Sequence, residues 1–382
     1  MANNFRKMAP WLVLAGVALM PRRAGPRPDR RRAGTARPAP PPPRRAPSEG
    51  LNDRPAPAHN ATDPAEINDA ARGRQANAPQ EIPAKGWKDI VLRTGKEFQN
   101  DQIPLVAAGV TFYSLLALFP GIGSFVALYG LFADVGQAQE HLQALSVVLP
   151  ADVLRFVGEQ MLRIAQASDS GLSLAFIGGL LLSLWSANGA MKAMITALNI
   201  AYDEHEKRGF IKMILVSLAF TLGFLLFGAC AIAVIAAPPA IERIVGGSAA
   251  AMFRVITWPA LLLALAAGLA VLYRFGPSRH RAKWKWLTWG SAAAIVLWVA
   301  VSAAFSIYVA NFANYEKTYG SLGAAIGFMM WIYVSSQVIL LGAELNSEIE
   351  HQTARDTTVG PEKPLGARGA VMADTVGAKQ GG

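Results

Sequence analysis

The sequence predicts an all-α, polytopic membrane protein with six transmembrane helices, both ends cytoplasmic, plus amphipathic surface helices. Three observations support this class: six long charge-poor runs, no strand alternation of the β-barrel kind, and Lys and Arg concentrated in alternate connections. About 20 apolar residues cross a hydrocarbon core, and lipid cannot hydrogen-bond the backbone, so the runs are expected to be helices. They are Leu105–Phe132, Leu172–Met191, Met213–Ala237, Ala251–Tyr273, Leu287–Ala310 and Tyr319–Asn346.

Residues 1–84 are predicted to be a disordered, Arg/Pro-rich cytoplasmic tail, because residues 21–60 hold ten Arg and almost no large apolar side chain. The tail is either simply solvated or attracted to anionic lipids of the adjacent leaflet. Its apolar segment, residues 8–20, is short for a span and lacks a small-residue cleavage pattern. We therefore expect an interfacial helix or an unusual anchor there rather than a cleaved signal.

The membrane domain is predicted at residues 85–351, and residues 352–382 are expected to form a disordered C-terminal tail. An amphipathic helix should precede the first span, with apolar side chains such as Ile90 on one face and basic ones such as Arg93 elsewhere. A second amphipathic helix is expected on the outer surface, within Ala133–Gly171.

The first span should kink or break near its middle. Pro120 removes a helical hydrogen bond, and Gly121 and Gly123 follow at once. A broken helix at membrane depth is tolerated only against protein or a water-filled cavity. The break is therefore either the wall of a substrate path or a purely structural kink.

Polar residues within the second and last spans recur on one face of each helix, and such faces usually turn toward protein or water rather than lipid. Lys192 and Glu344 both fall at the inner edge of the bundle, so they either pair there or lie separately at the interface. The candidate polar path consists of Tyr113, Asn188, Lys192, Asn199, Tyr333, Gln337 and Glu344.

Small residues at helical spacing let two helices approach closely. Gly323 and Gly327 form such a pair at the start of the last span, and Gly320 extends the row. Packing is the expected use of this row, either within one chain or in a homo-oligomer.

The connections set the orientation, because cytoplasmic loops of membrane proteins are rich in Lys and Arg. The connection after the second span carries Lys207, Arg208 and Lys212, whereas Pro238–Ala250 has only Arg243. The connection after the fourth span is also basic, with Arg274, Arg279, Arg281, Lys283 and Lys285. These two connections are thus predicted to be cytoplasmic, as are both ends of the domain.

Four separated motifs resemble the YihY/BrkB family of bacterial inner-membrane proteins, in the family's order and across residues 85–351. They are Ala107–Leu115, Trp185–Gly189 with Leu198–Tyr202, Tyr319–Gly323 and Gly342–Asn346. The resemblance implies an integral, multi-pass protein of the bacterial inner membrane with six helices and cytoplasmic ends. It also implies a function among the labels that such proteins have carried: a tRNA-processing ribonuclease, a virulence factor, or an exporter of lipid precursors.

The ribonuclease label finds no support in the residues. Metal-assisted phosphodiester hydrolysis uses clustered His and Asp ligands. The five histidines, His59, His141, His205, His280 and His351, are scattered, and no metal constellation or nucleophile motif is present. The sequence therefore predicts a protein that is not an enzyme and has no catalytic residue, metal or cofactor.

Two functional classes remain. One is a transporter or exporter of a lipid-like or small amphiphilic envelope substrate, favoured by the polar faces and the broken first span. The other is a non-transporting scaffold or envelope-integrity factor. The expected partners are the lipid bilayer, anionic lipids at the basic tail and a second copy of the chain, with no specific nucleic acid.

Overall fold

The computed structural model describes residues 60–61, 63–132, 169–236, 246–312 and 322–380. The chain divides into two compact units, Met1–Asp53 and Arg54–Gly382, and every described residue belongs to the second. These residues form helices and connections without a β-strand, which confirms the predicted all-α class for this part of the chain. The segment 8–20, most of the predicted N-terminal tail and the expected outer helix lie outside the described residues.

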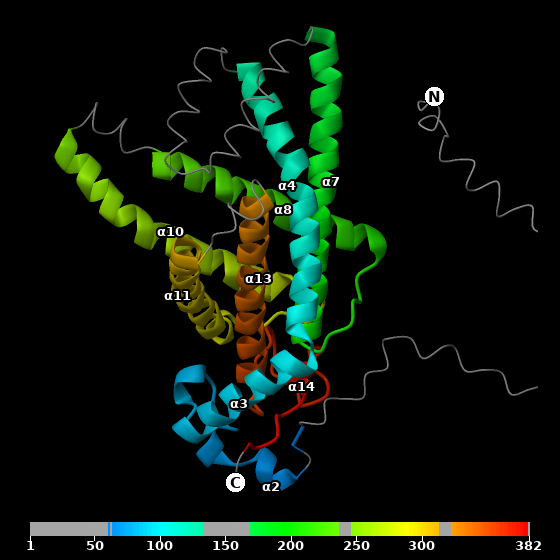
Figure 1. The fold of residues 1–382 in the computed structure, drawn as a ribbon. Coiled ribbons are helices and arrows are strands. Elements are labelled where there is room, and N and C mark those ends of the chain that lie inside the picture. The colour runs from blue at the N-terminus through cyan, green and yellow to red at the C-terminus, as the bar shows by residue number, and fades with distance from the viewer. Residues whose placement is uncertain (1–59, 62, 133–168, 237–245, 313–321, 381–382) are drawn as a thin grey trace, which may run out of the picture. The chain divides into compact units, whose positions relative to one another are not determined.

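Six helices of 25 residues or more account for most of the described chain (Figure 1). They are α4 (Ile103–Phe132), α7 (Asp169–Ala201), α8 (Phe210–Ala236), α10 (Gly247–Phe275), α11 (Thr288–Phe312) and α13 (Leu322–His351). The shorter elements are α2 (Pro64–Ile67), η1 (Ala70–Arg72), η2 (Pro79–Glu81), α3 (Ala84–Asn100), η3 (Trp284–Trp286) and α14 (Val371–Asp374).

Four helical stretches are long and apolar enough to cross a membrane: Phe210–Ile235, Ala251–Phe275, Trp284–Tyr308 and Ile326–His351. They coincide with the last four predicted spans. The first two predicted spans fall on α4 and α7, which have 30 and 33 residues. The described residues therefore contain four candidate membrane-spanning helices and two further long helices at the expected places.

The core lies where α4, α7 and α13 stand side by side, while α8 and α10 cross them obliquely (Figure 1). Small side chains on these helices, such as Ala107, Ala197 and Ala343, are fully buried and allow close packing. Larger apolar side chains, among them Leu198 and Leu340, fill the remaining space. Away from this contact the helices expose large apolar side chains, as expected for surfaces that face lipid.

α11 and α13 approach each other closely at Gly290 and Gly342. A Cβ added to Gly290 would overlap the carbonyl oxygen of Gly342 and the side chain of Asn346, and one added to Gly342 would lie 2.7 Å from Ala294 Cβ. The same contact is fixed by a hydrogen bond of 2.9 Å from the Gly290 amide to Asn346 Oδ1. The conspicuous Gly342–Asn346 motif thus joins two helices.

The predicted glycine row lies elsewhere. A Cβ added to Gly327 would meet nothing within 4 Å, so Gly327 makes no close helix contact with the part of the chain that the structure describes. Gly323 belongs to the first turn of α13, and Gly320 lies outside the described residues. Of the two expected uses, packing within one chain therefore finds no support at Gly327, and packing against a second copy stays a prediction.

α4 is a single helix through Pro120, Gly121 and Gly123, so the chain does not leave the helical conformation there. Figure 1 shows α4 bent part-way along its length. The expected interruption is thus at most a bend, which is consistent with the loss of one backbone hydrogen bond at a proline.

The C-terminal segment 352–380 is packed and not disordered, in contrast to the prediction. Thr353, Thr357 and Ala373 are fully buried in it, and the Arg368 guanidinium donates to four backbone carbonyls, those of Ala354, Arg355, Lys363 and Ala373. The polar composition of this segment predicted disorder, but its polar side chains form hydrogen bonds with backbone groups, which composition does not reveal. Residues 63–84 are also ordered, since the Arg74 guanidinium donates to the carbonyls of Gln352 and Gly377.

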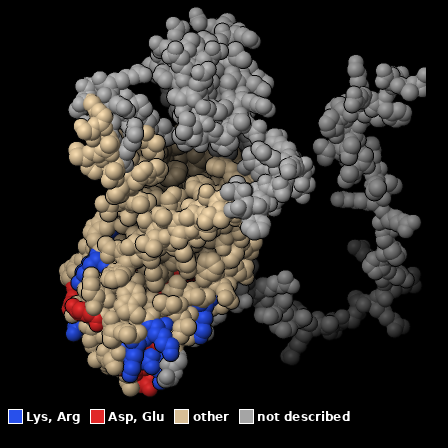
Figure 2. Space-filling view, turned by 60° about the vertical axis from the view of Figure 1, so that its left-hand side comes forward, with Lys and Arg blue, Asp and Glu red and all other residues tan. Residues whose placement is uncertain are grey.

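The polar end of the helices gathers α2, α3, α14 and the C-terminal segment (Figure 1). On the face that Figure 2 shows, Lys, Arg, Asp and Glu collect at this end, and the rest of the described surface in view is largely uncharged. α3 is the amphipathic helix that the sequence predicts, and Ile90 is fully buried. Arg93 departs from the prediction, because it is also buried and pairs with Glu348 of α13 at 2.5 Å.

Candidate functional site

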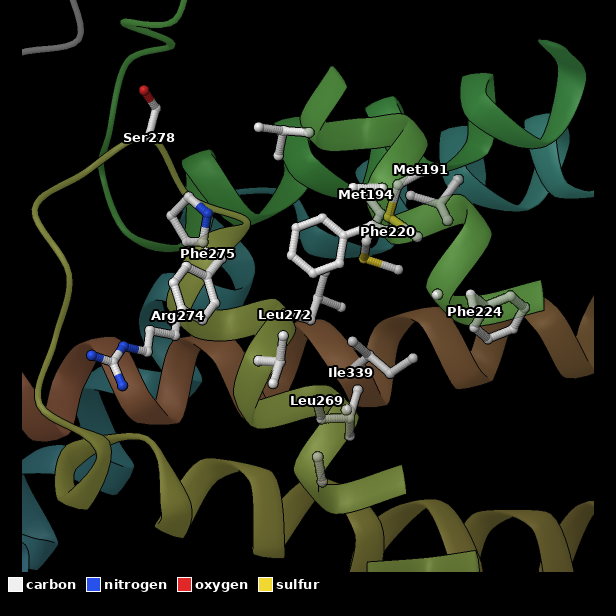
Figure 3. Close-up of a pocket in the computed structure, with 18 of the residues that line it drawn as sticks. Met191, Met194, Phe220, Phe224, Leu269, Leu272, Arg274, Phe275, Ser278 and Ile339 are labelled. Carbon is white, nitrogen blue, oxygen red and sulfur yellow. The ribbon is translucent and has the colours of Figure 1, made fainter. Parts of the chain in front are cut away.

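A cavity of about 1450 Å³ lies among α4, α7, α8, α10, α11 and α13. Figure 3 shows side chains from several of these helices around it. The labelled apolar ones are Met191, Met194, Phe220, Phe224, Leu269, Leu272, Phe275 and Ile339. Thioether and aromatic side chains of this kind adapt to ligands of irregular shape. The body of the cavity is thus suited to a hydrocarbon.

Small residues create much of this space. Ala219 and Gly223 lie one turn apart on α8, Ala264 and Gly268 lie one turn apart on α10, and all four line the cavity. A Cβ added to Gly223 or Gly268 would meet nothing within 4 Å. The two helices therefore present short side chains to the same hollow, and the sequence does not fill it.

Basic side chains line one part of the cavity, and no Asp or Glu is among its described lining residues. They come from the α7–α8 connection with the start of α8, from the end of α10 with the α10–η3 connection, and from the C-terminal segment. We call this set the basic rim: Lys207, Arg208, Lys212, Arg274, Arg279, His280, Arg281, Lys363 and Arg368.

Part of the rim is structural. Arg279 pairs with Glu350 at 2.5 Å with both side chains buried, and its guanidinium lies 4.4 Å from the ring centroid of Tyr202. Burial lowers the pKa of Arg279, but the surrounding acidic groups, with Glu350 foremost, together outweigh burial and raise it. Arg279 therefore stays charged and fastens the α10–η3 connection to the end of α13.

Glu206 neutralises Arg208, which approaches it at 2.7 Å. Burial raises the pKa of Glu206, but hydrogen bonds from Arg208 and Asn199 prevail and hold it at about 2. Asn199 also accepts from the Ser278 amide at 2.7 Å, so this group ties the end of α7 to the α10–η3 connection. These contacts position the rim.

The C-terminal segment fixes the rim from the other side. The amides of His280 and Lys283 donate to the carbonyls of Gly369 and Thr357, and the Val359 amide donates to the Arg281 carbonyl. Backbone pairing of this kind is independent of side-chain chemistry. The connection that carries Arg279, His280 and Arg281 is therefore held between α13 and the C-terminal segment.

Four rim cations have no ion-pair partner within the described chain: Lys212, Arg274, Arg281 and Lys363. Two of them rest on aromatic rings. Arg274 lies 4.2 Å from the Trp284 ring centroid, and Arg281 lies 4.9 Å from that of Phe275. A ring face holds a guanidinium without using its N–H donors, which point along the guanidinium plane.

None of the seven residues of the predicted polar path lines the cavity. Tyr113 lies against Gly189 of α7, Tyr333 packs against the core, and Asn199 has the structural role described above. Asn188 is buried with its Oδ1 unpaired, and Gln337 is half-buried. The structure does not bring these side chains together into one site.

The predicted pairing of Lys192 with Glu344 is wrong. No ion pair joins them in the described chain, and both Glu344 carboxylate oxygens are buried without a hydrogen-bond partner. Helical spacing predicts which residues share a face of a helix, but it does not determine the direction in which that face points.

The basic rim was visible in the sequence as loop charge, although loop charge alone indicated only orientation. Its convergence on one cavity depends on the C-terminal segment and on helix crossings that no local pattern specifies. Among the described residues, no group of three or more His, Cys, Asp or Glu side chains is arranged to hold a metal ion.

Comparison with known proteins gives consistent matches. A family model described as "Virulence factor BrkB" matches residues 94–365. A ribonuclease-like protein, YfkH of Bacillus subtilis, is 30% identical over 251 residues, which cover 63% of this chain and 88% of that protein. A UPF0761 membrane protein of Rhodospirillum centenum is 28% identical over 309 residues, covering 80% and 67%. Another from Idiomarina loihiensis is 22% identical over 280 residues, covering 69% and 94%. No solved structure matches the chain.

Proposed function

The chain belongs to the virulence factor BrkB family of membrane proteins, and from this premise we propose that it transports or exports a lipid-like amphiphile of the cell envelope. The observation that supports this most is the cavity of about 1450 Å³ between long apolar helices. A ligand site in a membrane bundle is expected to be concave, largely apolar and marked by a few polar groups. The cavity has these properties.

The proposal includes a topology. α4 and α7 join the four candidate spans to make six transmembrane helices in the bacterial inner membrane, with both ends cytoplasmic. The basic connections at Lys207–Lys212 and Arg274–Lys285 support a cytoplasmic position for the charged end. The gathering of charge at one end of the described surface, beside the C-terminal segment, agrees with it (Figure 2).

A transporting protein fits this cavity better than a scaffold does. A scaffold gains nothing from a large internal hollow, because unfilled space forfeits packing energy. The ribonuclease-like name belongs to the B. subtilis relative. In this chain the described lining has basic and apolar side chains without a carboxylate that could act as a general base.

Lipid movement across reconstituted vesicles tests the proposal. Purified protein in liposomes containing a tail-labelled fluorescent lipid should raise the fraction of probe that a membrane-impermeant quencher reaches, with or without an imposed pH gradient. Gly223→Trp should abolish this gain by filling the cavity. Gly228→Trp is the matched control, because Gly228 lies on the same helix in open space and does not line the cavity. No gain with the wild-type protein, or equal gain with both variants, would contradict the proposal.

A further inference from the structure

We propose that the amphiphile is an acidic lipid whose anionic headgroup binds at Lys212, Arg274 and Arg281 while its acyl chains occupy the cavity. This rests on the proposed function only in taking the cavity as the binding site. Beyond the proposed function, the inference specifies the charge of the ligand, the residues that bind its charged group and the orientation of the lipid.

The first support is charge. All titratable side chains among the described lining residues are basic, and none of them is acidic. The bias of cytoplasmic loops toward Lys and Arg accounts for the number of cations. It does not account for the incomplete neutralisation, because the nearby Glu204, Glu206 and Glu350 pair only with Lys207, Arg208 and Arg279. Four lining cations therefore keep a positive charge that no carboxylate of the described chain pairs with: Lys212, Arg274, Arg281 and Lys363.

The second support is the division of labour among the arginines. Arg208, Arg279 and Arg368 each form an ion pair with a carboxylate, and Arg368 also donates to backbone carbonyls. Arg274 and Arg281 lie on ring faces, as Arg279 does on Tyr202, but neither of the two forms an ion pair within the described chain. A planar guanidinium held by its face is pre-oriented to bind a phosphate or carboxylate through two parallel N–H bonds.

Burial of Arg274 points the same way. Its Nε atom is buried and has no hydrogen-bond partner. A buried donor without a partner costs free energy, so such a group is expected to acquire one from a ligand. Arg274 also lines the cavity, as Figure 3 shows with Phe275 and Leu272 beside it. An anion at this place would satisfy the orphaned donor.

The third support is length. Along α13 the lining residues run from Phe328 to Ile339, eleven steps that correspond to about 16 Å of helix rise. This is about half of a hydrocarbon core of roughly 30 Å, the depth of one leaflet. The apolar body therefore matches acyl chains from one leaflet, with the headgroup at the basic rim.

Tryptophan quenching by lipids with brominated acyl chains tests the inference. Trp298 and Trp331 line the cavity, so the difference in quenching between the wild type and a W298F/W331F variant isolates it. Full-length protein would be placed in phosphatidylcholine nanodiscs. Brominated phosphatidic acid would be compared with chain-matched brominated phosphatidylcholine and diacylglycerol. We expect phosphatidic acid to reach half-maximal quenching at a mole fraction at least about tenfold lower, the factor that one charge-assisted hydrogen bond supplies.

The K212Q/R274Q/R281Q variant should lose this preference and still bind diacylglycerol as the wild type does. The K85Q/K88Q/K285Q variant removes equal charge from exposed residues outside the cavity lining and should keep the preference. Equal quenching by all three lipids would overturn the acidic-lipid inference and leave the proposed function standing. Absence of cavity quenching by any lipid would overturn both. A preference that survives in K212Q/R274Q/R281Q would overturn the assignment of these residues.

Discussion

The Arg274 guanidinium lies over the indole ring of Trp284, with its Cζ 4.2 Å from the ring centroid, and no carboxylate pairs with it in the described chain. Five residues further on, Arg279 is paired with Glu350 and buried. Arg274 lies in the last turn of α10 and Arg279 in the connection that follows it, and both line one cavity. Arg279 thus stabilises the fold through its ion pair, whereas the guanidinium of Arg274 is available to bind a ligand.

Loss of the Arg279 ion pair should destabilise the protein. Arg279→Gln would leave Glu350 buried without its partner, and breaking a buried pair in this way costs about 3 to 5 kcal/mol. Denaturant unfolding in detergent would measure the change. The control is Lys212→Gln, at an exposed residue without an ion pair in the described chain, which should change stability by less than about 0.5 kcal/mol. Equal effects of the two substitutions would contradict the division between stabilising and ligand-binding cations.

The α11–α13 contact should be intolerant of a methyl group. Gly290→Ala would force the helices apart at Gly342 and Asn346 and should cost about 1 to 3 kcal/mol or more. Gly327→Ala should be neutral or stabilise by up to about 1 kcal/mol, because its Cβ meets nothing and alanine favours a helix. The melting temperatures of the two variants, compared with that of the wild type, test both expectations. A destabilised Gly327→Ala would show instead that the glycine row packs, for example against a second copy.

Acid should weaken the tie between α7 and the α10–η3 connection. The folded pKa of Glu206 is about 2, below the ordinary value of 4.5, so the carboxylate stabilises the fold above pH 4.5. This contribution should fade as the pH falls from about 4.5 to about 2. The difference in melting temperature between the wild type and Glu206→Gln, measured across this range, should shrink toward low pH. A constant difference would rule out the titration of Glu206.

Topology reporters test the six-helix proposal. A reporter fused after Gly382 should be active only in its cytoplasmic form, and one inserted in the connection between α8 and α10 should be active only in its exported form. This follows from the excess of Lys and Arg in the connections on the opposite side. An exported C-terminus would reverse the proposed orientation and place the basic rim outside.

The sequence predicted the helices that the lipid environment requires. It did not predict the features that depend on contacts with distant parts of the chain. Leu287–Ala310 and the other late spans appear as helices because charge-poor runs have few alternatives in lipid. The 352–380 segment was misjudged because Arg368 is satisfied by backbone carbonyls that composition cannot reveal. Gly290 drew no attention, since its importance comes from Gly342 and Asn346 on a different helix.

The candidate site was the least predictable part. The stripes through Lys192 and Gln337 follow correct helical spacing, but the rotation of each helix is set by its packing. The cavity depends on Gly223 and Gly268, which lie on helices that cross obliquely. The loop cations were recognised, although only the fold shows that they meet at one rim.

Photo-crosslinking in intact cells tests most directly whether an amphiphile occupies the cavity. Cells would be fed a fatty acid with a diazirine near its end, which their own lipids incorporate, and labelled peptides of the irradiated protein would be mapped. We expect enriched labels at the cavity residues Met191, Met194, Phe220 and Ile339. Labels confined to the exposed residues Leu226 and Leu263, which do not line the cavity, would contradict an amphiphile bound inside it.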